Sequence, residues 1–445
     1  MKLLLVSYWF PPSNTIGAVR VGKLAKFLHA RGHDVRVLCG PEVAPTTLPL
    51  EVPQDLLLRP PPDTANGVET PVPHPGFPRL LRRMLTARGE AAVRLHYRAL
   101  RDIPDKRVVW LRPALAAGRA LLQQWQPDLI VASGPPFTGA VLAHRLGRES
   151  GVPWIAELRD PWTDDPYNAA PRWRRHIDRF VERRTLSTAA ALVCVSPPVA
   201  RDLAARYDVP VRTVLNGFSP EDMVEPPARP PGDTLSIVYT GSIYVGFRDP
   251  SKLFAAIARL GPLRSRVEVR FYGPTAAQIM PLAARHGVAD RVQVCGNVGY
   301  RESLALQAAA DVLLLLQRDH PSDDGNIPAK FFEYLGARRP ILLLGYARGV
   351  IADMIRTRGA GFIAQDTDDL AAQLRQWIGQ LPAGIPPLPE AARDGLSRTE
   401  QFGAYEAFLA ELACPVRPVR EPAPMTTRTA LAVPDGWPAA AARPR

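Results

Sequence analysis

Short apolar runs alternate with segments of helical periodicity along most of this chain. The N-terminus shows the pattern clearly. Residues 2–8 predict a buried strand, residues 17–31 carry apolar side chains at helical spacing, and residues 34–39 predict the next strand. This β–loop–α–β order predicts parallel strands joined by crossover helices. The chain is therefore restricted to an α/β fold, in which ligands bind at the carboxyl ends of the strands.

The alternation occurs in two series, separated by a proline-rich linker at residues 221–233. Each series is long enough for a doubly wound sheet. We therefore expect two Rossmann-like domains, at residues 1–222 and 234–380, that face each other across a cleft. A C-terminal helix at residues 394–412 is expected to pack back on the first domain. Residues 413–445 are rich in Pro, Ala and Arg and lack periodicity, which predicts a disordered tail.

A polar loop leads into a helix at residues 323–340, in the second series. Pro328 fits the first turn of that helix, and Lys330 and Glu333 are three residues apart, so both face one way. A helix N-terminus suits a phosphate, to which Lys330 adds a cation. Glu333 adds an acceptor for a pair of hydroxyls, such as those of a ribose. The alternative is an ordinary strand–loop–helix with a surface Lys–Glu pair.

The first domain offers candidate groups at the ends of two predicted strands. Asp160, after the strand at residues 154–158, can orient a substrate hydroxyl or accept its proton, and the neighbouring Arg159 can hold a phosphate. An Asp–Pro turn stabilised by an internal Arg–Asp pair is the alternative. The loop that ends at Gly17 follows the first strand, but it is not a GxGxxG, so a dinucleotide site is only weakly indicated.

Charge and composition narrow the class of partner. The net charge of +12 favours anionic partners, namely nucleotide-sugar phosphates, lipid head groups or nucleic acid. No recognised nucleic-acid module appears, so we expect no nucleic-acid partner. The four cysteines show no CxxC and have no His at ligand spacing, so we expect no metal site.

One basic stretch of the sequence bears on whether the chain contacts a membrane. No apolar run approaches the ~18–20 residues of a transmembrane helix, so we expect a chain that is soluble or bound to a membrane surface. Residues 78–107 are strongly basic, with apolar side chains interspersed. They predict either an amphipathic helix for a membrane surface or lipid acceptor, or a solvated basic helix face.

Taken together, these segments resemble glycosyltransferase family 4, the large retaining group with the GT-B fold. The resemblance covers residues 1 to about 412 and rests on the order and spacing of several motifs. They are Phe10-Pro11-Pro12 with Gly17 and Arg20, Arg159-Asp160-Pro161-Trp162, Asn216-Gly217-Phe218, Tyr239-Thr240-Gly241-Ser242, Phe271-Tyr272-Gly273 and residues 327–335. The segments at residues 133–137 and 159–162 resemble a bacterial subgroup associated with exopolysaccharide and glycan assembly.

The resemblance implies a reaction and a set of roles. A sugar leaves a nucleoside diphosphate with retained configuration, positive charge stabilises the leaving group, and no metal or other cofactor is needed. The implied donor-binding residues are Gly17, Gly241, Gly273, Asn326, Ile327 and Glu333. The implied catalytic residues are Asp160, Arg159, Arg248 and Lys330, and the implied acceptor-binding residues are Asn14, Arg20 and Phe137.

Two positions depart from the family pattern. The first Glu of the family's Glu-x7-Glu motif falls at Gly325, where the adjacent Asp324 is the available substitute. The His found near the site in many members falls at Arg159. These departures leave open a non-catalytic relative that binds a nucleotide-sugar or glycan. The same fold also admits a sugar-nucleotide 2-epimerase.

The resemblance and the basic stretch at residues 78–107 together suggest where the chain acts. We expect it in the cytoplasm, at the inner face of the inner membrane as a peripheral protein. Its partners would be a nucleotide-sugar donor and a glycan, lipid-linked or small-molecule acceptor.

Overall fold

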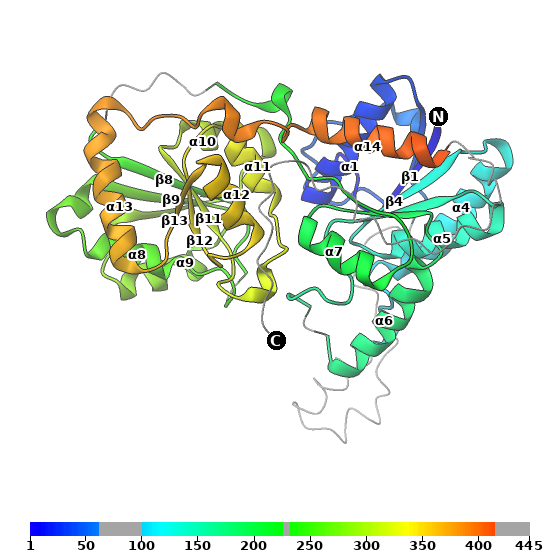
Figure 1. The fold of residues 1–445 in the computed structure, drawn as a ribbon, viewed down its shortest axis with the longest axis horizontal. Helices are drawn as coiled ribbons and strands as arrows, with labels where there is room; N and C mark the ends of the chain where they lie inside the picture. The colour runs from blue at the N-terminus through cyan, green and yellow to red at the C-terminus, as the bar shows by residue number, and fades with distance from the viewer. Residues whose placement is uncertain (62–99, 169, 226–231, 245, 414–445) are drawn as a thin grey trace, which may run out of the picture. The chain divides into compact units, whose positions relative to one another are not determined.

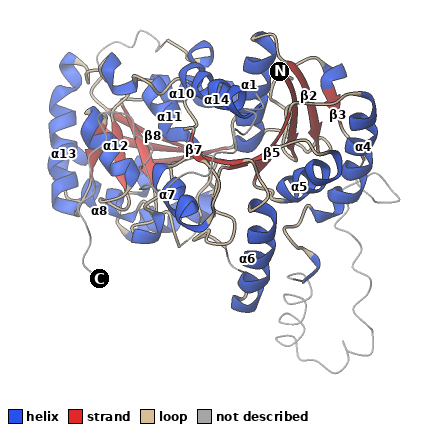
Figure 2. Ribbon diagram, turned by 45° about the vertical axis from the view of Figure 1, so that its right-hand side comes forward, coloured by secondary structure: helices blue, strands red, loops and turns tan. Residues whose placement is uncertain are grey.

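The computed structural model describes residues 1–61, 100–168, 170–225, 232–244 and 246–413. Two parallel β-sheets, each covered by helices, account for most of these residues (Figures 1 and 2). Most of the basic stretch at residues 78–107, and the expected tail from residue 414 onward, lie outside the described residues.

The first sheet has seven strands in the order β3-β2-β1-β4-β5-β6-β7. These strands are β1 (Lys2–Ser7), β2 (Asp34–Cys39), β3 (Leu57–Leu58), β4 (Leu129–Gly134), β5 (Trp154–Leu158), β6 (Ala191–Cys194) and β7 (Val211–Thr213). Its helices are α1 (Ile16–Ala30), α4 (Leu111–Gln124), α5 (Thr138–Ser150), α6 (Arg172–Leu186) and α7 (Pro197–Arg206). The strand order reverses between β1 and β4, and the carboxyl ends of strands at such a switch point form a ligand-binding crevice.

The second sheet has six strands in the order β10-β9-β8-β11-β12-β13. These strands are β8 (Leu235–Thr240), β9 (Val267–Tyr272), β10 (Val292–Gly296), β11 (Val312–Leu316), β12 (Ile341–Leu344) and β13 (Gly361–Ile363). Its helices are α8 (Ser251–Ala258), α9 (Ala276–Arg285), α10 (Tyr300–Ala309), α11 (Ala329–Gly336), α12 (Val350–Arg358) and α13 (Thr367–Gln380). Here the order reverses between β8 and β11, so the loops after β8 and before α11 meet at one edge.

The predicted α/β class with two doubly wound sheets is confirmed. Several strands have the predicted bounds because they are uninterrupted apolar runs, buried along their whole length, such as β11 and β12. Helix α7 and strand β3 were not predicted from the sequence. Helix α7 begins with two prolines, and β3 is a two-residue strand within a proline-rich segment.

The last helix, α14 (Arg398–Ala413), packs on the first sheet although it follows the second in sequence. Its side chains Phe402, Tyr405 and Leu409 are buried in one apolar cluster with Leu3 of β1 and Leu24 of α1. The C-terminal helix therefore completes the core of the N-terminal half.

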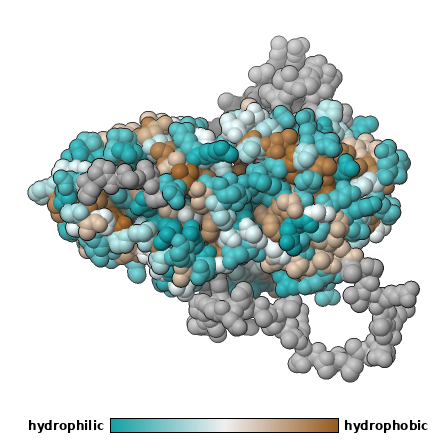
Figure 3. All heavy atoms as spheres, turned by 90° about the horizontal axis from the view of Figure 1, so that it is seen from above, coloured by the Kyte–Doolittle hydropathy of each residue, from teal (hydrophilic) through white to brown (hydrophobic). Residues whose placement is uncertain are grey.

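One face of the molecule shows how polar and apolar residues are distributed on its surface. On the face shown in Figure 3, hydrophilic residues predominate and hydrophobic residues lie among them in small groups. Among the described residues, none of the helices combines the length and the hydrophobicity needed to span a bilayer.

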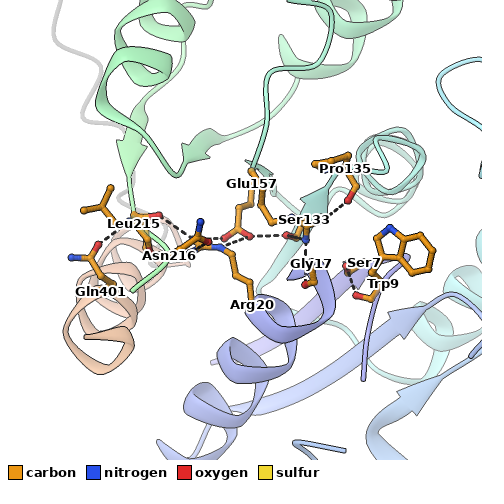
Figure 4. A network of polar contacts seen from close by, with 12 residues as sticks. Ser7, Trp9, Gly17, Arg20, Ser133, Pro135, Glu157, Leu215, Asn216 and Gln401 are labelled. Carbon is orange, nitrogen blue, oxygen red and sulfur yellow. Dashed lines mark hydrogen bonds and ion pairs between the residues drawn. The ribbon is translucent and has the colours of Figure 1, made fainter. Parts of the chain in front are cut away.

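A buried ion pair holds α1 against the centre of the first sheet (Figure 4). Arg20 of α1 donates from Nε and Nη2 to the two carboxylate oxygens of Glu157 on β5, each at 3.1 Å. Ser133 of β4 donates to the same carboxylate at 2.6 Å. The remaining Arg20 donors reach the carbonyls of Val214 and Leu215 and the side chain of Asn216. One guanidinium thus joins α1, β5 and the segment after β7.

The ionised form of Glu157 is favoured despite its burial. Burial raises the pKa of Glu157, but Arg20, Ser133 and Arg159 outweigh burial and hold that pKa below its ordinary value. Removing one partner of a buried pair leaves the other charge without compensation, which costs about 3–5 kcal/mol. The pair therefore acts as a strong constraint on the position of α1.

We expect Glu157→Ala to lower the free energy of unfolding by about 3–5 kcal/mol, because Arg20 would remain buried without its carboxylate. The measurement is urea unfolding followed by tryptophan fluorescence. Glu149→Ala is the matched control, since its partner Arg119 is exposed and such a pair contributes about 1 kcal/mol or less. Equal losses in the two variants would contradict the structural role of the Arg20–Glu157 pair.

Candidate functional site

A cavity of about 590 Å³ lies at the carboxyl ends of strands from both sheets. The first sheet contributes the residues after β5 and the start of α7, and the second contributes the loops after β8 and before α11. Five of the predicted site residues line it, namely Arg159, Asp160, Arg248, Asn326 and Ile327. We call it the donor-side cavity, after the donor-binding residues predicted there.

Two glycines and a lysine form a close cluster at the ends of β8 and β9. Gly241 and Gly273 have φ of 109° and 112°, which favours glycine. A Cβ on Gly273 would lie 2.6 Å from the Gly241 carbonyl oxygen, and a Cβ on Gly241 would lie 2.7 Å from Lys330 Nζ. Lys330 donates to the Thr240 carbonyl and lies over the Tyr239 ring, 4.0 Å from its centroid. The predicted residues Gly241, Gly273 and Lys330 are therefore brought together.

Lys330 is poised between its charged and neutral forms. Burial, together with the positive charge of Arg248, lowers its pKa to about 7, and Glu333 opposes this shift. An anion bound beside Lys330 would stabilise the ammonium form. The cluster is therefore an electropositive site without a protein anion of its own to neutralise it fully.

Glu333 lies one helical turn along α11 from this cluster. Its Oε2 accepts a hydrogen bond of 3.1 Å from Gln307 Nε2, and the same nitrogen donates to Thr240 Oγ1 at 3.0 Å. Gln307 is fully buried, so it fixes the carboxylate relative to the end of β8. Gln307 lies on α10, outside every motif of the sequence, and was therefore not predicted as a site residue.

The positive charge of Arg248 acts on titratable groups in both halves of the chain. Its Nη1 donates to the Ser242 carbonyl at 3.2 Å, and its guanidinium lies 4.5 Å from the centroid of the Tyr244 ring. Its positive charge lowers the pKa of Asp160 as well as that of Lys330. An arginine that acts on both groups is placed where a diphosphate between them would be neutralised.

Asp160 is exposed toward the cavity, and the protein around the cavity reduces the hydration of its carboxylate. This desolvation raises its pKa, and the positive charges of Arg159 and Arg248 oppose the rise. A carboxyl group with a raised pKa in a cavity is suited to proton transfer or to orienting a hydroxyl.

Arg159 contacts the protein more than the cavity. Its guanidinium donates to Ser133 Oγ at 2.9 Å and to the carbonyls of Pro135 and Gly17. A Cβ on Gly17 would lie 2.7 Å from Arg159 Nη2. The structure thus gives Gly17 a reason to be glycine that differs from the expected approach to a donor phosphate: it makes room for Arg159.

The three predicted acceptor residues are dispersed. Arg20 is buried with all its guanidinium groups engaged by protein, so the expected acceptor contact does not fit its position. Asn14 Nδ2 donates to Thr47 Oγ1 at 2.8 Å, which holds the loop before α1. Phe137 stacks on Trp162, with ring centroids 4.6 Å apart and an interplanar angle of 4°.

Phe137 and Trp162 belong to a second cavity of about 630 Å³, on the side of the first sheet. Residues 104–107, Pro135, Pro136 and the inward side of α6 also line it. The two cavities share Asp165 and Tyr167 and are therefore adjacent. We call the second one the acceptor-side cavity.

Tyr167 lines both cavities, and it was not predicted from the sequence. Its hydroxyl donates to Asp323 Oδ2 at 2.9 Å, and its ring lies 5.6 Å from the Tyr244 ring and 5.2 Å from the Phe247 ring. Asp323 and both aromatic residues come from the second half. No local pattern predicts this contact, because the hydrogen-bonded residues are 156 positions apart.

The absence of a carboxylate at Gly325 has a steric reason. A Cβ on Gly325 would lie 3.1 Å from Val199 Cγ2 and 3.6 Å from Ser196 Oγ, at the start of α7. A contact of 3.1 Å is tighter than ordinary packing, so the Val199 side chain would have to shift by a few tenths of an ångström to admit any side chain at this position. Asp324, the proposed substitute, does line the donor-side cavity.

Comparisons with known proteins agree with this architecture. Residues 17–217 match the family model of the glycosyl transferase 4-like domain. A comparison with the sequences of curated proteins finds no match.

Several solved structures share the fold. Sucrose-phosphate synthase from Thermosynechococcus elongatus superposes with a TM-score of 0.62 at 15% identity, over 92% of this chain and 98% of that one. HepE of Anabaena, in complex with UDP, gives 0.59 at 14% identity, over 92% and 99%. WaaG, a glycosyltransferase involved in lipopolysaccharide biosynthesis, gives 0.53 at 16% identity, over 93% and 99%.

These likenesses cover nearly the whole length of each structure, and at such identities they establish the fold. The family model independently identifies the first half. The chain therefore has the GT-B fold, and residues 17–217 form a glycosyl transferase 4-like domain.

Proposed function

We propose that this protein is a glycosyltransferase that moves a sugar from a nucleoside-diphosphate-sugar to an acceptor with retention of configuration. The observation that carries the proposal is the cluster of Lys330, Gly241 and Gly273 beside Glu333 and Arg248, at the switch point of the second sheet. The match of residues 17–217 to a glycosyltransferase domain supports it.

In the proposed mechanism, the diphosphate lies beside Lys330 and Arg248, at the N-terminus of α11. Positive charge at that position stabilises the leaving group as the glycosidic bond breaks, without a metal or other cofactor. Glu333, held by Gln307, accepts hydrogen bonds from the ribose hydroxyls. Asn326 and Ile327 line the same cavity and contact the donor.

The acceptor enters the acceptor-side cavity, whose Phe137–Trp162 stack offers an apolar wall. Asp160 orients the attacking hydroxyl and takes up its proton. Arg159 positions the loops around Gly17 and Pro135 rather than contacting substrate. A glycan, a lipid-linked sugar and a small molecule are all admitted as acceptors.

By the resemblance of its motifs, we also assign the chain to a bacterial exopolysaccharide or glycan-assembly subgroup. We place it in the cytoplasm, as a peripheral protein at the inner membrane. The charge of +12 supports an anionic partner of this kind.

We expect one class of uridine-, guanosine-, adenosine- or thymidine-diphosphate sugar to bind saturably in calorimetry. Glu333→Ala and Arg248→Ala should each weaken that binding about 10–100-fold, because each removes a charge-assisted hydrogen bond. Arg259→Ala is the matched control, since Arg259 is exposed at the C-terminal end of α8 and pairs with Asp368. The absence of binding to all donors by folded protein would refute the donor site.

Donor binding should also take up a proton near pH 8. Free Lys330 has a pKa of about 7 and is largely neutral there, and a bound diphosphate would raise that pKa and protonate the amine. Affinity should then fall as the pH rises above 7. The measurement is calorimetry in buffers of different ionisation enthalpy, and Lys330→Met should abolish the uptake. Uptake that persists in this variant would assign the proton to another group.

Asp160→Asn should lower turnover about 100-fold or more while leaving donor affinity nearly unchanged, since Asp160 acts on the acceptor hydroxyl. Nucleoside-diphosphate release, with a panel of simple sugar acceptors or water, measures turnover. Asp208→Asn, at an exposed position of the same half, is the control. Donor binding without release by the wild-type protein would instead indicate a non-catalytic binding relative. Release of a free 2-epimer would indicate an epimerase.

A further inference from the structure

The acidic and most of the basic side chains of α6 lie on opposite sides of the helix. Its two carboxylates, Asp178 and Glu182, face the protein and are 4% and 2% exposed. Five of its six arginines face outward and are exposed. They are Arg172, Arg175, Arg179, Arg183 and Arg184. We call this outward side the basic face of α6.

The inward charges are neutralised within the protein. Asp178 accepts a hydrogen bond of 2.6 Å from the one inward arginine, Arg174. Glu182 accepts hydrogen bonds of 3.0 Å from the Thr163 amide and from the Tyr207 hydroxyl. Their negative charge therefore does little to offset the arginines on the other side.

The outward arginines are only partly compensated. Arg179 forms an ion pair of 3.0 Å with Asp164, and Arg175 donates to the Asn168 carbonyl. Within the described ranges, no ion pair involves Arg172, Arg183 or Arg184. The neighbouring helix α5 adds the exposed Arg145 and Arg148, so the positive surface extends across two helices.

The basic face also carries an exposed aromatic side chain. Phe180 is 66% exposed and lies between Arg179 and Arg183 in sequence. In water such a phenyl ring gains nothing from exposure. At a lipid interface, a ring flanked by arginines can insert among the acyl chains while the guanidinium groups contact the phosphates. In Figures 1 and 2, α6 lies at the lower edge of the described helices in both views.

We propose that the basic face of α6 docks this protein on an anionic lipid bilayer. The five arginines complement the negative headgroups, and Phe180 supplies the apolar contact. The 15-residue helix, about 22 Å long, would lie parallel to the membrane plane. This inference rests on the placement at the inner membrane proposed above and names the surface responsible. Because that surface lies outside the donor-side cavity, its test is separate from that of the transfer reaction.

The test is flotation of the full-length protein with phosphatidylcholine vesicles that contain or lack phosphatidylglycerol. Wild-type protein should float only with phosphatidylglycerol and should be released by salt. The triple change R172E/R183E/R184E should weaken binding about 100-fold, since each arginine near the surface contributes about fivefold. Phe180→Ser should weaken binding several-fold at every salt concentration, because its contribution is apolar.

The triple change R259E/R285E/R375E is the matched control, with the same change in net charge at exposed arginines of the second half. It should leave flotation nearly unchanged. Equal losses in the two triple variants would show that only net charge matters and would overturn the proposal. So would failure of the wild-type protein to bind phosphatidylglycerol at low salt. Should the α6 triple variant unfold, R184Q and Phe180→Ser alone still have to weaken binding.

Discussion

The buried contact between Arg20 and Glu157 is the constraint on which the N-terminal half depends. The guanidinium reaches three separate parts of the chain, namely β5, the carbonyls after β7 and, through Glu157, Ser133 of β4. Ser133 in turn accepts from Arg159, which holds the loops at Gly17 and Pro135. A series of charge-assisted hydrogen bonds, which begins at Arg20, thus fixes the loops around the candidate site.

In the second half, the charged side chains of the candidate site are not fully compensated by partners within the protein. Lys330 and Arg248 are cations held close together, and the neighbouring carboxylate Glu333 only partly compensates them. Such an arrangement is unfavourable in an empty site and favourable once a polyanion arrives. The cost of bringing the charges together is met during folding, so the site is already organised when its ligand binds.

The sequence predicted the parts of this molecule that depend on local pattern. Apolar runs such as β11 and β12 identified the strands, and their order placed ligand loops at the carboxyl edges. Lys330, Gly241 and Gly273 were found because they follow those strands directly. Pattern did not predict the partners of buried polar groups. Arg20 was expected to contact an acceptor, yet it binds carbonyls almost 200 positions away, and Tyr167 binds Asp323 across 156 positions.

The position of Tyr167 bears on how ligand binding in one cavity can affect ligand binding in the other. Its ring borders both cavities, while its hydroxyl is bonded to Asp323 in the loop that leads to α11. A ligand in either cavity that prefers one position of this side chain changes the affinity of the other cavity. By linkage, the change is equal in both directions. Coupling of this kind requires only that the ligands of the two cavities favour different positions of the Tyr167 ring.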